Sequence, residues 1–207
     1  MAGTIDYYFT LASPWTYIGH AAFMDIARRH GAAVRFKPML LGPLFELTGG
    51  LPLPKRNPFR QRYRLVELQR WREARGIDLN LHPRHWPFDP SLPDRVAIAI
   101  ALGGGDPDGY VRLVMHGVWA GGLDLSREET IADLAGQAGH DASALLAAAR
   151  SPEAEATYAG HREEALAADV FGAPSYVLGG EVFWGQDRLD LLERALASGR
   201  PAYRHEG

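Results

Sequence analysis

Hydrophobic positions in the first forty or so residues predict a strand, a helix and a second strand. Residues 4–9 (TIDYYF) are β-branched and aromatic, which is typical of a strand. Residues 14–30 have helical spacing, and Gly31 closes that helix. Residues 34–40 (VRFKPML) alternate and predict a strand that ends at or near Pro38. This order indicates a βαβ unit with parallel strands.

The middle of the chain lacks the alternation of a strand. Residues 41–59 are rich in glycine and proline and predict a long loop. From Arg60 to about Ala168 the spacing is helical, and the first of these helices should turn Tyr63, Val66 and Trp71 inward.

Alternation returns near the C-terminus. Residues 174–178 and 181–184 predict two antiparallel strands, joined by a two-residue turn at Gly179-Gly180. A final helix follows, with three leucines on one face.

The order β-α-β, helical block, β-β-α predicts an α/β protein with a thioredoxin-like fold and a large all-helical insertion. Residues 1–42 and 169–207 would form the thioredoxin-like domain, and residues 43–168 the helical insertion. The two ends of the chain would then share one sheet.

Composition narrows the classes of function. With 207 residues, 46% of them hydrophobic and 23% charged, the chain can bury a sizeable core. Its net charge of −3 argues against nucleic acid as a partner. No apolar run reaches the ~20 residues of a membrane span, and the N-terminus lacks a signal-peptide pattern. We therefore expect a cytoplasmic protein that binds no membrane.

The chain contains no cysteine. This excludes disulfides, thiolate metal sites and a cysteine nucleophile. Any sulfur chemistry must therefore come from a bound small molecule.

Ser13-Pro14 follows the first strand and opens the first helix. Serine is a preferred N-cap and proline a preferred first helical residue, so capping alone accounts for the pair. Ser151-Pro152 shows the same dipeptide at another helix start. Ser13, however, lies at the carboxyl end of a parallel strand, where open α/β sheets bind ligands. A helix N-terminus there also favours a bound anion.

Two C-terminal motifs, like Ser13-Pro14, can be interpreted either as structural or as ligand-binding. Pro174, which begins a strand after Gly172-Ala173, is either an ordinary trans proline or a cis proline that turns the backbone of Ala173 toward a ligand. Gln186 and Asp187 either cap the last helix or form an amino-acid pocket. In that pocket helix N–H groups would bind the α-carboxylate and Asp187 the α-ammonium.

The segments YYFTLASPWTYIG, FGAPSYV and FWGQDRLDLLERAL, in this order, resemble the 2-hydroxychromene-2-carboxylate isomerase family over nearly the whole chain. That family is related to kappa-class glutathione transferases and, more distantly, to DsbA-type oxidoreductases. The resemblance implies bound glutathione, usually a homodimer, and a small aromatic carboxylate as substrate. Two departures are Thr48-Gly49-Gly50 where many relatives have an asparagine, and Glu67 where an aspartate is common.

Carried over by position, Ser13 stands where redox relatives have their first cysteine and would hold the glutathione sulfur as thiolate. Ala173, beside a cis Pro174, would pair with the cysteinyl backbone. Gln186 and Asp187 would bind the γ-glutamyl end. Lys55 would bind the glycyl carboxylate or another anion, although a solvated loop lysine is an equal alternative.

Aromatic residues could wall a substrate pocket. Trp15, Trp86 and Phe88 are the candidates, and core packing is the alternative for each of them. His82 and His85 lack a third ligand, so we expect no metal. The arginines between residues 60 and 75 are expected on a solvated helix face.

Three functions remain open. The first is a glutathione-dependent cis-trans isomerase that acts on a 2-hydroxychromene-2-carboxylate-type substrate through reversible thiolate addition. The second is a kappa-like glutathione transferase, which would release the adduct. The third is a redox-inert ligand-binding protein, which would not need an amino-acid pocket at Gln186 and Asp187.

Overall fold

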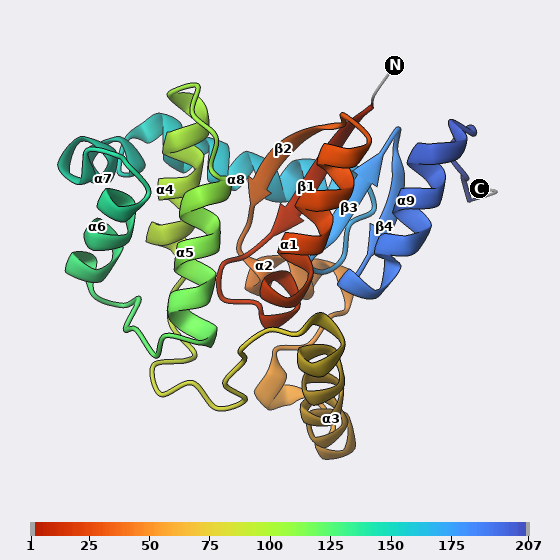
Figure 1. Cartoon of the computed structure of the whole chain (residues 1–207), viewed down its shortest axis with the longest axis horizontal. Helices are drawn as coiled ribbons and strands as arrows, with labels where there is room; N and C mark the ends of the chain where they lie inside the picture. The colour runs from red at the N-terminus through yellow and green to blue at the C-terminus, as the bar shows by residue number, and fades with distance from the viewer. Residues whose placement is uncertain (1–2, 206–207) are drawn as a thin grey trace.

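The elements follow the predicted order in the computed structural model, which describes residues 3–205 (Figure 1). Residues 1, 2, 206 and 207, which belong to the predicted thioredoxin-like domain, lie outside the described residues. The strands are β1 (Thr4–Phe9), β2 (Ala33–Pro38), β3 (Ser175–Leu178) and β4 (Glu181–Trp184). The α-helices are α1 (Pro14–Arg29), α2 (Leu41–Thr48), α3 (Pro58–Arg75), α4 (Ser91–Leu102), α5 (Asp108–Trp119), α6 (Glu128–Gln137), α7 (Ala142–Ala149), α8 (Pro152–Ala167) and α9 (Leu189–Ser198). Two short 3₁₀ helices are η1 (Leu53–Lys55) and η2 (Gln186–Arg188).

The four strands form one mixed sheet in the order β2-β1-β3-β4. β1 pairs parallel with β2 and antiparallel with β3, and β3 pairs antiparallel with β4. The two ends of the chain therefore share one sheet, and the thioredoxin-like α/β prediction is confirmed.

Alternate residues of β1 pack into opposite layers. Tyr7 belongs to a cluster with Phe23 of α1 and Leu192 of α9. Tyr8, its neighbour, packs instead in a second cluster with Leu44 of α2 and Ala165 of α8. Figure 1 shows α1 and α9 in front of the sheet and α8 behind it. The period-2 alternation of β1 thus buries both faces of the sheet.

The buried core continues from the sheet into the helical block. One cluster joins Tyr7 and Phe23 to Tyr110 of α5 and Leu134 of α6. The limits proposed for the helical insertion, residues 43 and 168, stay a prediction. No helix within residues 3–205 is both long and apolar enough to cross a bilayer.

Two local predictions were wrong. The expected loop after β2 contains α2, because Pro43 stands in the first helical turn, where its missing N–H costs no hydrogen bond. In α3, Tyr63 and Val66, both expected to point inward, are 59% and 42% exposed, whereas Leu68 is the buried residue. Inward and outward positions of α3 therefore do not follow hydrophobicity alone.

A buried polar chain joins β1, α1 and α5. The Tyr7 hydroxyl donates to Nδ1 of His20 (3.2 Å), and Nε2–H of His20 donates to the Asp108 carboxylate (2.8 Å). Burial lowers the pKa of His20, so its imidazole is neutral. Burial alone would raise the pKa of Asp108, but hydrogen bonds from His20 and Arg112 lower it to about 2.

The hydrogen-bonded chain of Tyr7, His20 and Asp108 predicts that the folded protein loses stability in acid. Because the folded pKa of His20 lies below its unfolded value of about 6.5, the stability it contributes is lost as pH falls below that value. The slope reaches at most about 1.4 kcal/mol per pH unit for one such group. Urea unfolding between pH 7.5 and 5 should show a smaller loss in His20→Gln than in the parent protein. The exposed control His116→Gln should match the parent; equal slopes in the parent and His20→Gln would contradict the assignment.

Candidate active site

Antiparallel pairing of β1 with β3 brings two distant segments together. Tyr8 lies opposite Ser175, so the carboxyl end of β1 meets the amino end of β3. Ser13 follows the first of these ends, and Ala173-Pro174 precedes the second. All three line one cavity of about 820 Å³, together with Gln186 and Asp187.

Ser13 is the N-cap of α1. Its Oγ accepts a hydrogen bond from the Thr16 N–H (3.3 Å), and Pro14 stands in the first turn. Ser151 caps α8 in the same way, with Oγ accepting from the Ala154 N–H (3.2 Å). Capping is therefore confirmed for both serines. Only Ser13 also lines the cavity, at 7% exposure.

The Ala173-Pro174 peptide bond is cis, as predicted. The Ser175 hydroxyl donates to the Gly172 carbonyl (2.8 Å), and the Gly185 N–H donates to the Pro174 carbonyl (2.8 Å). Within residues 3–205 the backbone of Ala173 itself makes no hydrogen bond. An N–H and a C=O at the cavity wall thus remain available to a ligand backbone.

Gln186 and Asp187 open η2, and neither side chain caps it. Gln186 is buried, and Oε1 accepts from the Arg75 guanidinium (3.2 Å). The Asp187 carboxylate is half-exposed and pairs with Arg188 (2.6 Å). Both residues line the cavity.

The remaining predicted residues divide into two groups. Trp15 and Trp86 line the cavity, and Nε1–H of Trp86 donates to the Ala12 carbonyl (2.9 Å). Phe88 instead packs against the core and is not among the lining residues. Lys55 is exposed on η1 and likewise does not line the cavity. Its assignment to glutathione stays a prediction.

One face of α3 lines the cavity, which hydrophobic periodicity did not reveal. The spacing i, i+3, i+4, i+7, i+11 is that of a single helix face. Its members are Arg60, Tyr63, Arg64, Glu67 and Trp71. The expectation that the arginines of α3 lie on a solvated face is wrong for Arg64 and for Arg75, which are both partly buried. Arg56, beside Lys55, also lines the cavity.

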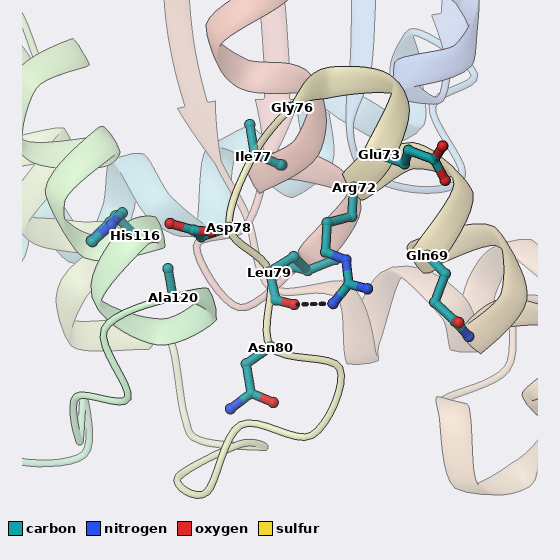
Figure 2. A pocket seen from close by; sticks show the side chains of 10 residues that line it. All are labelled: Gln69, Arg72, Glu73, Gly76, Ile77, Asp78, Leu79, Asn80, His116 and Ala120. Carbon is teal, nitrogen blue, oxygen red and sulfur yellow. Dashed lines mark hydrogen bonds between the residues drawn. The ribbon is translucent and has the colours of Figure 1, made fainter.

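A second hollow lies away from Ser13. Figure 2 shows it between the end of α3, the segment after it and the end of α5, where Arg72 donates to the Leu79 carbonyl (3.3 Å). None of the predicted site residues lines this hollow. Within residues 3–205 no group of acidic and histidine side chains could hold a metal ion.

A buried carboxylate supports the segment before Ser13. Asp94 of α4 accepts from the Leu11 N–H (3.0 Å) and the hydroxyls of Thr10 (3.3 Å) and Tyr158 (2.9 Å). Burial raises the pKa of Asp94 to about 7, although these hydrogen bonds favour its charged form. Asp94 thus anchors the turn between β1 and α1.

Comparison with known proteins agrees with this geometry. Residues 4–197 match the DSBA-like thioredoxin domain family. A 2-hydroxychromene-2-carboxylate isomerase from Sphingobium xenophagum is 30% identical over 95% of this chain and 99% of its own length. Another of the same name, from Pseudomonas putida, is 29% identical over 93% of each chain. A solved structure of a 2-hydroxychromene-2-carboxylate isomerase superposes with a TM-score of 0.79 at 28% identity, covering 94% of this chain and 95% of that one.

The fold and the matched residues make this chain a DsbA-like thioredoxin-domain protein. It lacks the cysteines of the redox members. Within that class it belongs to the 2-hydroxychromene-2-carboxylate isomerase family, so the resemblance found in the sequence is confirmed.

Asp94 predicts a dependence of folding stability on pH that is opposite to the one predicted for His20. Its folded pKa exceeds its unfolded value of about 3.9, so its contribution to stability is lost as pH rises from about 4 to about 7. Urea unfolding of Asp94→Asn should lack this loss. The variant should therefore gain stability relative to the parent by on the order of a few kcal/mol across that window. Exposed Asp133→Asn serves as control, and a constant difference between Asp94→Asn and the parent would refute the prediction.

Proposed function

We propose that the protein is a glutathione-dependent cis-trans isomerase of an aromatic 2-hydroxychromene-2-carboxylate-type substrate. Membership of a family whose relatives are named for this reaction supports the reaction class. The observation that carries the proposal is Ser13, a serine in place of the redox cysteine, which lines the cavity at the start of α1.

The residues present fit glutathione. The backbone of Ala173 has a free N–H and C=O with which a cysteinyl backbone can pair, as an added strand would. Gln186 and Asp187 of η2 line the cavity, and there a γ-glutamyl carboxylate and ammonium would bind. Arg56 is a candidate for the glycyl carboxylate alongside Lys55, because Arg56 lines the cavity.

Bound glutathione supplies a thiol that can add reversibly to a conjugated acid. Ser13 can serve it without losing its role as a cap, because a hydroxyl offers one donor and two acceptor positions. Its lone pair accepts from Thr16 while its O–H is free to donate to a sulfur anion. The partial positive charge at the start of α1 further stabilises that anion. Trp15 and Trp86 provide apolar walls for an aromatic ring.

A kappa-like glutathione transferase is the second candidate, because the same cavity would serve both reactions. A redox-inert ligand-binding protein is less well supported, since Gln186 and Asp187, the candidates for an amino-acid pocket, line the same cavity as Ser13. We further propose a cytoplasmic homodimer that binds neither nucleic acid nor membrane, on the basis of family resemblance and net charge.

The reaction class is tested by following glutathione during turnover. With hydroxybenzylidene pyruvate as substrate, we expect isomerisation that requires glutathione and leaves its concentration unchanged. Stoichiometric loss of glutathione, with this substrate or with chlorodinitrobenzene alone, would identify a transferase. Isomerisation that proceeds equally without glutathione would refute the cofactor.

Ser13→Ala and Ser151→Ala form a matched pair. Each removes an equivalent helix cap, so each should lower the unfolding free energy by about 1 kcal/mol. Only Ser13→Ala should also raise the pKa of the bound glutathione thiol, by about one to two, because it removes a hydrogen bond to a charged group. Thiolate absorbance titration of both complexes measures this. If Ser13→Ala leaves both the thiol pKa and the turnover unchanged, Ser13 acts only as a helix cap.

A further inference from the structure

We propose that Arg64 binds the carboxylate of the aromatic substrate and so determines the preference of this enzyme for acids. This inference rests on the proposed function, and it names the residue that recognises the charged end of the substrate. Nothing in the sequence motifs around Ser13 or Gln186 assigns such a role to α3.

Arg64 lies beside the candidate reaction centre. It lines the same cavity as Ser13 and Trp15. Its guanidinium carbon lies over the Trp86 ring, 5.5 Å from the ring centroid. Trp86 in turn is hydrogen-bonded to the carbonyl of Ala12, the residue before Ser13. The position of the guanidinium is thus tied through one aromatic ring to the segment that carries Ser13.

The charge of Arg64 has no counter-ion in the part of the chain that the structure describes. Within residues 3–205 its guanidinium forms no ion pair and no hydrogen bond. Burial, and secondarily the charge of Arg56, lower its pKa to about 10, so it stays protonated at neutral pH. A half-buried cation without a partner is costly, and a bound anion would relieve that cost.

The other charged side chains that line the cavity either have a partner within the protein or are exposed to water. Glu67 pairs with Arg70, and Asp187 pairs with Arg188. The Arg56 guanidinium donates to the Leu51 carbonyl (2.7 Å). Arg60 is exposed, so water screens its charge. Arg64 is therefore the cation best placed to attract a negative charge into the apolar part of the cavity.

The surroundings of Arg64 favour a planar aromatic acid. A guanidinium binds a carboxylate through two parallel hydrogen bonds. The Trp86 ring beneath it, and Trp15 in the same cavity, offer flat apolar surface for an aromatic ring. The carboxylates of glutathione can also bind a guanidinium, but glutathione has no aromatic ring. An experiment must therefore distinguish the carboxylate of the substrate from those of glutathione.

Calorimetric titration with cinnamate and with its uncharged analogue cinnamamide provides the test, in saturating S-methylglutathione. The parent protein should bind cinnamate more tightly than cinnamamide. Arg64→Gln should weaken cinnamate binding by about 10- to 100-fold and leave cinnamamide binding unchanged. Arg64→Lys should retain part of the preference. Arg62→Gln is the matched control, because Arg62 lies on the same helix but is exposed and outside the cavity lining.

Several results would overturn the proposal. These are no preference for cinnamate in the parent protein, an unchanged preference in Arg64→Gln, or an equal loss in Arg62→Gln. A second titration with glutathione alone separates the two sources of carboxylate, since weaker glutathione binding in Arg64→Gln would assign Arg64 to the cofactor instead. If circular dichroism shows that Arg64→Gln does not fold, Arg64→Lys takes its place. An undiminished preference for cinnamate over cinnamamide in Arg64→Lys would then overturn the proposal. None of these readouts needs turnover, so a protein that lacks isomerase activity can still pass or fail them.

Discussion

The antiparallel pairing of β1 with β3 is the constraint on which the rest of the structure depends. Because the carboxyl end of one strand lies beside the amino end of the other, Ser13 and Ala173 line the same cavity although 160 positions separate them. The helices between β2 and β3 extend the core without disturbing this pairing, and one face of α3 contributes to the cavity lining. A helix N-terminus, a cis proline segment and a helical wall are thus assembled around one strand junction.

Sequence reasoning succeeded where local chemistry is decisive. β4 has the predicted bounds because Gly179 and Gly180, both with positive φ, permit the two-residue turn that fixes its register. Ser13 and Ser151 cap their helices because a serine before a proline satisfies a free N–H and begins a helix at once.

Reasoning from local patterns failed where tertiary packing decides. The α3 face at the cavity mixes arginines, a glutamate and aromatic residues, so no hydrophobic period distinguishes it from a solvated face. Lys55 and Arg56 are neighbours in sequence, yet only Arg56 lines the cavity, because the turn at η1 directs consecutive side chains differently. Phe88 is aromatic like Trp86 but packs into the core, and its residue type alone could not reveal this.

Of the five tryptophans in the chain, four line this cavity: Trp15, Trp71, Trp86 and Trp184. Trp119 is the exception, buried in the core against Trp86. The intrinsic fluorescence of the protein therefore originates mainly from the walls of its binding site. A ligand that stacks on these rings or displaces water from them will change the emission directly, so the protein carries its own optical reporter of occupancy.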